Sequence, residues 1–111
     1  MKKLVLFLFA MLSPFLVNAY QYGSVTATTG ATLVMAASRG RTGVVLCNDG
    51  TAKIYIGLDS SLTTANGLPI GGNSCYSASS PQETWKGTFY AITTTGTADV
   101  RYQEYGLGDV Q

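Results

Sequence analysis

The chain has 111 residues, and the first 19 have the features of an export signal, which leaves 92 (111 − 19) for one small domain. It contains no histidine, so Ser-His-Asp and Cys-His catalysis and histidine-ligated zinc are excluded. The formal net charge is +1, and without Lys2 and Lys3 the five remaining basic residues face six acidic ones, giving −1. This balance supplies no basic face for phosphates, so we expect no nucleic-acid partner.

Residues 1–19 are expected to be a signal peptide, with cleavage after Ala19. Met1-Lys2-Lys3 gives a positive end, an apolar run follows, and Val17-Asn18-Ala19 presents small or compact residues to a signal peptidase. The apolar stretch Leu4–Val17 would be about 21 Å long as a helix, shorter than the ~30 Å hydrocarbon core of a bilayer. The alternative is a retained hydrophobic helix, which would then be the only part of the chain in contact with a membrane.

Residues 20–111 form the second predicted unit, a β-domain. Short runs of β-branched and aromatic residues alternate with Gly, Asn, Asp and Ser, which is typical of strands and turns. About seven short strands without a helical period favour an all-β, antiparallel β-sandwich or jelly-roll-like domain. The expected strands are Ser24–Thr28, Thr32–Ala37, Thr42–Asn48, Lys53–Gly57, Cys75–Ser79, Thr88–Thr93 and Ala98–Tyr105.

Two connections are typical of hairpins. Asn48-Asp49-Gly50 tolerates positive φ, so we expect the third and fourth strands to pair antiparallel. The Gly-containing segment Thr93–Thr97 predicts a second hairpin between the last two strands, of which the final one has one apolar and one charged face. Apolar residues occupy both faces of the third strand, Val44 and Leu46 on one and Val45 and Cys47 on the other, which indicates a central position.

The segment Asn66–Gly72 is dense in turn-forming residues and encloses two apolar ones. We expect Leu68 and Ile70 to plug the open end of the core.

Cys47 and Cys75 can form a disulfide if the protein is exported to an oxidising compartment. The bridge would close a loop of 29 residues (75 − 47 + 1), worth about 3.6 kcal/mol in the chain-entropy model. Two buried reduced thiols fit the sequence equally well. Two cysteines alone do not complete a structural zinc site, so we expect neither a metal nor a cofactor.

Five short motifs in a fixed order resemble a family of small bacteriophage proteins, which occur beside structural genes or as a domain within virion proteins. The likeness covers roughly residues 39–105, and its order and spacing are more specific than any single motif. The resemblance implies a non-enzymatic β-sandwich that decorates or links virion components such as capsid, neck, tail or fibre. The motifs are Arg41–Asn48, Ile54–Gly57, Thr63–Ile70, Phe89–Ile92 and Ala98–Glu104.

Acid–base catalysis would depend on the carboxylates alone, and no two of them are expected to face each other across a cleft as a glycosidase requires. With no activated nucleophile either, we expect no enzymatic activity. Asp49 is interpreted as a turn residue and Asp99 as an exposed partner of Arg101 or of a neighbouring strand. The six carboxylates are Asp49, Asp59, Glu83, Asp99, Glu104 and Asp109.

Aromatic residues are numerous and offer rigid area for contact with protein or sugar. Alternation within strands places Phe89, Ile92 and Tyr102 in the core, whereas Tyr76 and Trp85 lie beside turns and are candidates for a contact surface together with Asn66, Leu68 and Ile70. A weakly charged surface rich in Ser and Thr favours self-association. The aromatic residues of the expected domain outside this core set include Tyr20, Tyr22, Tyr55, Tyr76, Trp85, Tyr90 and Tyr105.

Two functions therefore remain. The first is a structural protein of a bacteriophage virion that binds other virion proteins and copies of itself. The second is a secreted or periplasmic binding module for a glycan or an envelope protein, with Trp85 and Asn66–Gly72 at its site. The expected location is the virion, or an exported or periplasmic one if residues 1–19 act as a signal peptide.

Overall fold

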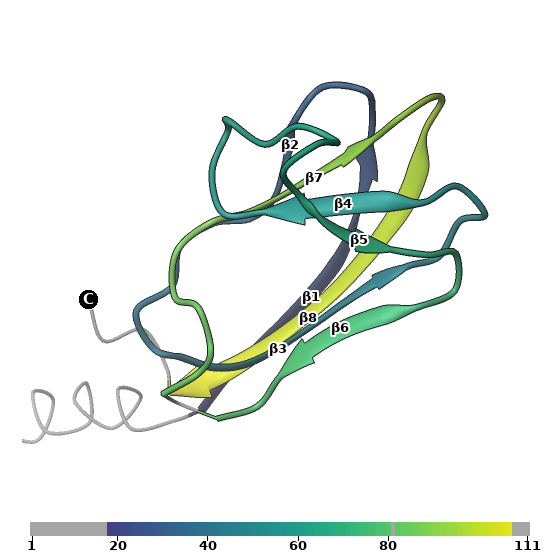
Figure 1. Ribbon diagram of the computed structural model, residues 1–111. Coiled ribbons are helices and arrows are strands. Elements are labelled where there is room, and N and C mark those ends of the chain that lie inside the picture. The colour runs from purple at the N-terminus through teal and green to yellow at the C-terminus, as the bar shows by residue number, and fades with distance from the viewer. Residues whose placement is uncertain (1–17, 81, 108–111) are drawn as a thin grey trace, which may run out of the picture.

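The computed structural model describes residues 18–80 and 82–107, which fold into two four-stranded antiparallel β-sheets packed as a sandwich (Figure 1). This part of the chain contains no helix, which confirms the all-β prediction. The strands are β1 (Asn18–Ala27), β2 (Thr32–Met35), β3 (Arg41–Asn48), β4 (Ile54–Gly57), β5 (Leu68–Ile70), β6 (Cys75–Ala78), β7 (Phe89–Thr93) and β8 (Ala98–Leu107).

One sheet has the order β1-β8-β3-β6 and the other β2-β7-β4-β5. Seven of the eight strands lie where the sequence predicts them, but β1 begins six residues earlier, at Asn18. The eighth, β5, was interpreted as a turn because it has only three residues among turn formers. β3 lies between β8 and β6, so the prediction that it is central is confirmed.

Both predicted hairpins are wrong, because each connection carries the chain from one sheet to the other. β3 belongs to the first sheet and β4 to the second, and the same holds for β8 and β7. A backbone hydrogen bond from Asp49 N to Asp99 O, 2.8 Å long, stabilises the connection between β3 and β4. The connection between β7 and β8 turns at Gly96, whose φ is +67°. Turn-forming residues serve a crossing between sheets as well as a hairpin, so local sequence does not separate the two.

The core lies between the two sheets and is built from the inward-facing side chains of both. Val44 and Leu46 of β3 are fully buried, while Val45 and Cys47 on its other face are half-buried. Ile70 is buried as predicted, but Leu68 is 52% exposed and does not plug the core. The buried apolar cluster comprises Ala27, Val34, Met35, Val44, Leu46, Ile54, Ile56, Ile70, Phe89, Ala91, Ala98 and Val100.

The two sulfur atoms of Cys47 and Cys75 are bonded, which joins β3 to the edge strand β6. The two residues are register partners, with Cα atoms 4.0 Å apart, on the face of the sheet that points away from the core. Of the expected signal segment, residues 1–17 lie outside the described residues, and the expected cleavage point after Ala19 falls two residues into β1. Residues 18–80 and 82–107 include no helix with the length and apolar character needed to cross a bilayer.

Candidate functional site: an interaction surface

The outer face of β1 exposes two tyrosines at the edge of the first sheet. Side chains alternate along a strand, so the partly buried Val25 and the fully buried Ala27 point to the core while the even-numbered residues point outward. Tyr20 and Tyr22 are 66% and 82% exposed. Aromatic side chains are enriched at protein–protein interfaces, so this pair is a candidate contact surface.

Tyr105 of β8 extends this aromatic surface toward β3. Its ring centroid lies 6.2 Å from that of Tyr20, its neighbour in register on β1. The ring also lies over Gly43 of β3, where an added Cβ would come within 2.3 Å of a ring carbon. Gly43 therefore leaves the space that the ring fills. We refer to Tyr20, Tyr22 and Tyr105 as the tyrosine strip.

Beside the tyrosine strip, Arg101 forms ion pairs with two carboxylates. Arg101 Nη2 lies 3.0 Å from Asp99 Oδ2 and 3.2 Å from Asp49 Oδ2, as the sequence predicts for Asp99. All three side chains are well exposed, so these ion pairs contribute little to stability. A shallow depression of about 520 Å³ lies next to them, lined by Tyr22, Gly23, Ser24, Arg101, Tyr102 and Gln103.

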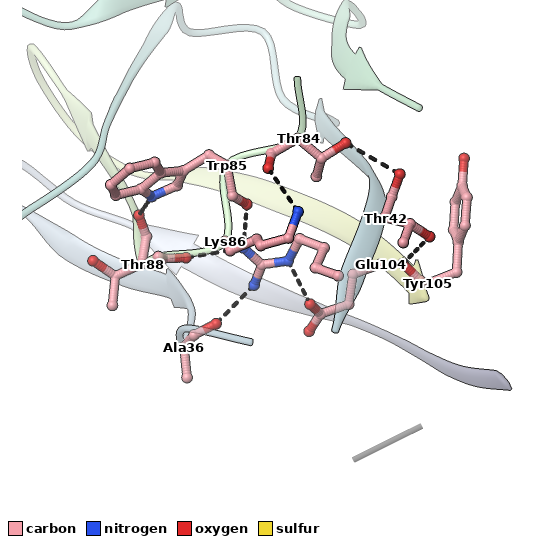
Figure 2. Close-up of polar contacts among 10 residues, drawn as sticks. Ala36, Thr42, Thr84, Trp85, Lys86, Thr88, Glu104 and Tyr105 are labelled. Atoms are coloured by element: carbon pink, nitrogen blue, oxygen red, sulfur yellow. Dashed lines mark hydrogen bonds and ion pairs between the residues drawn. The ribbon is translucent and has the colours of Figure 1, made fainter. Parts of the chain in front are cut away.

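A second group of residues, around Arg41, fixes the loop that precedes β7 (Figure 2). Arg41 is 1% exposed, and its Nε donates to Glu104 Oε1 at 2.7 Å. Its Nη1 donates to the carbonyls of Trp85 and Gly87, at 2.8 and 2.9 Å, and its Nη2 to that of Ala36, at 2.7 Å. Four of the five guanidinium N–H groups thus donate to the protein, which ties β3, β8 and two loops together.

Trp85 is presented by this fixed loop. Its side chain is 43% exposed, its Nε1 donates to the Thr88 carbonyl at 2.8 Å, and its ring lies over Gly87. Thr84, one residue earlier, donates from Oγ1 to the carbonyls of Thr42 and Ser80. Trp85 is therefore held in one orientation while part of its ring faces outward.

Tyr76 and Asn66, two of the other expected contact residues, make their contacts with parts of the chain other than Trp85. Tyr76 is half-buried and its ring lies 6.3 Å from that of Phe89, against the core. Asn66 accepts a bond from Thr63 N at 2.8 Å and stabilises its own loop. Among the described residues, no hydrogen bond or ring contact links Trp85 to the segment Asn66–Gly72.

The described carboxylates other than Glu83 have structural partners. Glu104 binds Arg41, and Asp49 and Asp99 bind Arg101. Hydrogen bonds from the hydroxyl and the amide of Ser61 lower the pKa of Asp59 below its ordinary value. Residues 18–80 and 82–107 contain no group of three metal-ligating side chains, and Asp109 lies outside them.

Sequence reasoning counted Tyr20, Tyr22 and Tyr105 among the aromatics but did not place them on one face, and it did not single out Arg41. Alternation could have placed Tyr20 and Tyr22 together, because Tyr20, Tyr22, Ser24 and Thr26 follow a period of two that the expected strand cut short. The sequence around an arginine at a strand end does not indicate whether its side chain is buried or exposed.

No protein-family model matches the chain, and no curated protein matches it either. Among the solved structures, the chain is similar to one from the study "Bacillus endospore appendages form a novel family of disulfide-linked pili". It has 14% sequence identity and a TM-score of 0.49, and the match covers 82% of this chain and 87% of that one.

Proposed function

We propose that this protein is a non-enzymatic structural protein of a bacteriophage virion, in which the β-sandwich decorates or links other components by direct protein contact. The observation that carries the proposal is the tyrosine strip, in which Tyr20 and Tyr22 are 66% and 82% exposed on a strand without charged residues. Rigid aromatic side chains of this kind supply contact area at a small entropy cost.

The phage assignment draws its support from the sequence resemblance. Four of its five motifs coincide with strands or lie within them: β3, β4, β7 and the first part of β8. The first motif begins and ends with Arg41 and Asn48, the two buried polar residues that fix the ends of β3. A shared motif of this type is consistent with a shared architecture, and the resemblance is what supports the proposed virion role.

The alternative is an exported module that recognises a glycan or an envelope protein. The partly exposed, fixed ring of Trp85 favours it, because a rigid aromatic face suits sugar stacking as well as protein contact. The disulfide is compatible with both functions, since it indicates an oxidising compartment at some stage.

Mass spectrometry of gradient-purified phage particles, beside periplasmic extracts of the same producing cells, separates the two functions. We expect this chain in the particles, at a ratio to the major capsid protein that stays constant across the gradient peak. A non-structural protein encoded by the same phage serves as the contamination control. Recovery only from the periplasmic extract, with none in the particles, would refute the virion assignment.

A further inference from the structure

β1 differs from the other three edge strands of the sandwich. It has ten residues, and in its sheet it pairs only with β8, so one side of its backbone faces no other strand (Figure 1). Within residues 18–80 and 82–107, no backbone hydrogen bond joins that free side to another segment. Unpaired N–H and C=O groups along such an edge are a template for pairing with another chain.

The other edges carry the features that prevent such pairing. β6 and β2 have four residues each, and a register shift interrupts β2 between Leu33 and Met35. β5 has three residues, and one of them is Pro69, which has no N–H to donate. In contrast, β1 contains no charged residue and no proline, and its register with β8 is continuous from Asn18 to Ala27.

We propose that β1 pairs antiparallel with β1 of a second copy of this chain, so that two sandwiches share one continuous eight-stranded sheet. This inference deepens the proposed function, on which it rests, by naming the first partner and the surface that binds it. A second copy is favoured because β1 is the only described edge long enough to pair with all of β1. Its lack of charge also means that self-pairing places no like charges opposite each other.

The two-fold axis of this pairing passes near Tyr22 and Gly23, the midpoint of the strand. Residues directly opposite each other in an antiparallel pair point to the same face of the sheet, so the outward-facing, even-numbered residues of one copy must pair with even-numbered residues of the other. Tyr22 therefore lies directly opposite or diagonal to Tyr22 of the second copy. The tyrosine strips of the two copies then meet and form one aromatic surface. The closed two-fold contact leaves the opposite edge, β6, outside the interface.

The test uses charge exchange at Tyr22 in the protein as purified from its producing cells. Light scattering and sedimentation velocity of the wild type should give twice the mass of one chain. Tyr22→Lys and Tyr22→Glu should each raise the dissociation constant at least about tenfold, because equal charges meet at the axis. An equimolar mixture of these two variants should recover dimers, since Lys then faces Glu.

Gln103→Lys is the matched control. Gln103 is exposed on the same face and is the register partner of Tyr22, but it lies on β8, one strand in from the edge. The same charge there should leave the dimer intact. If Gln103→Lys weakened the dimer as much as Tyr22→Lys does, the two copies would be docking through the outer face of the sheet, and edge pairing would be overturned.

The proposal would also be overturned if the wild type were monomeric at about 50 µM, a concentration well above the dissociation constants of ordinary protein pairs. Slow hydrogen exchange along both sides of β1 in such a monomer would show that another segment of the same chain occupies the edge. These outcomes are independent of particle composition: a monomer found in purified particles refutes the edge pairing alone, and a dimer absent from particles refutes the virion role alone.

Discussion

At the scale of single residues, two buried polar side chains fix the ends of β3. Arg41 binds three carbonyls and Glu104 at one end. At the other end Asn48, fully buried, donates from Nδ2 to the carbonyls of Ala52 and Ile70 and accepts from Gly50 N. Buried polar groups of this kind stabilise a fold only while every partner is present.

Replacement of Arg41 by Leu should destabilise the protein by about 3–5 kcal/mol, because it leaves a buried carboxylate and three carbonyls without donors. Glu104→Gln keeps an acceptor for Arg41 Nε and should cost less, about 1–3 kcal/mol. Urea unfolding followed by tryptophan fluorescence measures both. Arg39→Leu, an exposed site two residues away, is the control, and an Arg41→Leu variant as stable as this control would show that the buried network contributes nothing.

Asn48→Asp should make stability depend on pH. The carboxylate would face two carbonyls in a fully buried position, so its pKa in the folded protein should rise above the ordinary value. The variant should therefore be closest to wild type at acidic pH and lose stability relative to it as the pH rises above about 4. Thermal unfolding between pH 3 and 7 measures this difference. Asn66→Asp, at an exposed position, should show a much smaller pH dependence, and equal curves for the two variants would count against this account of Asn48.

At the scale of elements, the sequence predicts strand positions better than strand partners. β3 is recognisable as central because both its faces are apolar, and the alternation in β8 gives the correct inner and outer faces. The crossings after β3 and β7 were mistaken for hairpins because Asn48-Asp49-Gly50 and the turn at Gly96 provide the same φ freedom in either topology. Sheet membership depends on long-range packing, which a local pattern does not contain.

The tyrosine strip shows the same limit at the level of the candidate site. The chemistry of its side chains is visible in the sequence, but Tyr105 and Tyr20 are 85 residues apart in the sequence (105 − 20) and meet only through the pairing of β1 with β8. Its place over Gly43 depends in addition on the pairing of β8 with β3.

The disulfide should act on β6 as an element. β6 is a four-residue edge strand that pairs with β3 alone, so the bond from Cys75 to Cys47 secures it. Reduction should lower the free energy of unfolding by about 3–4 kcal/mol. Guanidinium unfolding with and without a phosphine reductant measures the loss, and a Cys47→Ser, Cys75→Ser variant, which is insensitive to the reductant, is the control. Equal stability of the oxidised and reduced wild type would contradict this role.

At the scale of the whole molecule, the sandwich has three short or interrupted edges and one long, uncharged edge that bears exposed tyrosines. Its buried ion pair, Arg41 with Glu104, holds loops in place. All of its described carboxylates except Glu83 have structural partners. The arrangement is that of a module whose specific features lie on its surface, at one sheet edge. The proposed function, assembly with other copies and other proteins, depends on this edge.

The most direct measurement of this claim is the incorporation of variants into particles. Phages carrying Tyr22→Lys or Gln103→Lys would be grown and purified in parallel, and the copy number of this chain per major capsid protein determined by quantitative mass spectrometry. The account predicts wild-type copy numbers for Gln103→Lys and a depletion of at least about tenfold for Tyr22→Lys, matching its weakened pairing. Equal incorporation of the two variants, with Tyr22→Lys shown to be monomeric in solution, would contradict it.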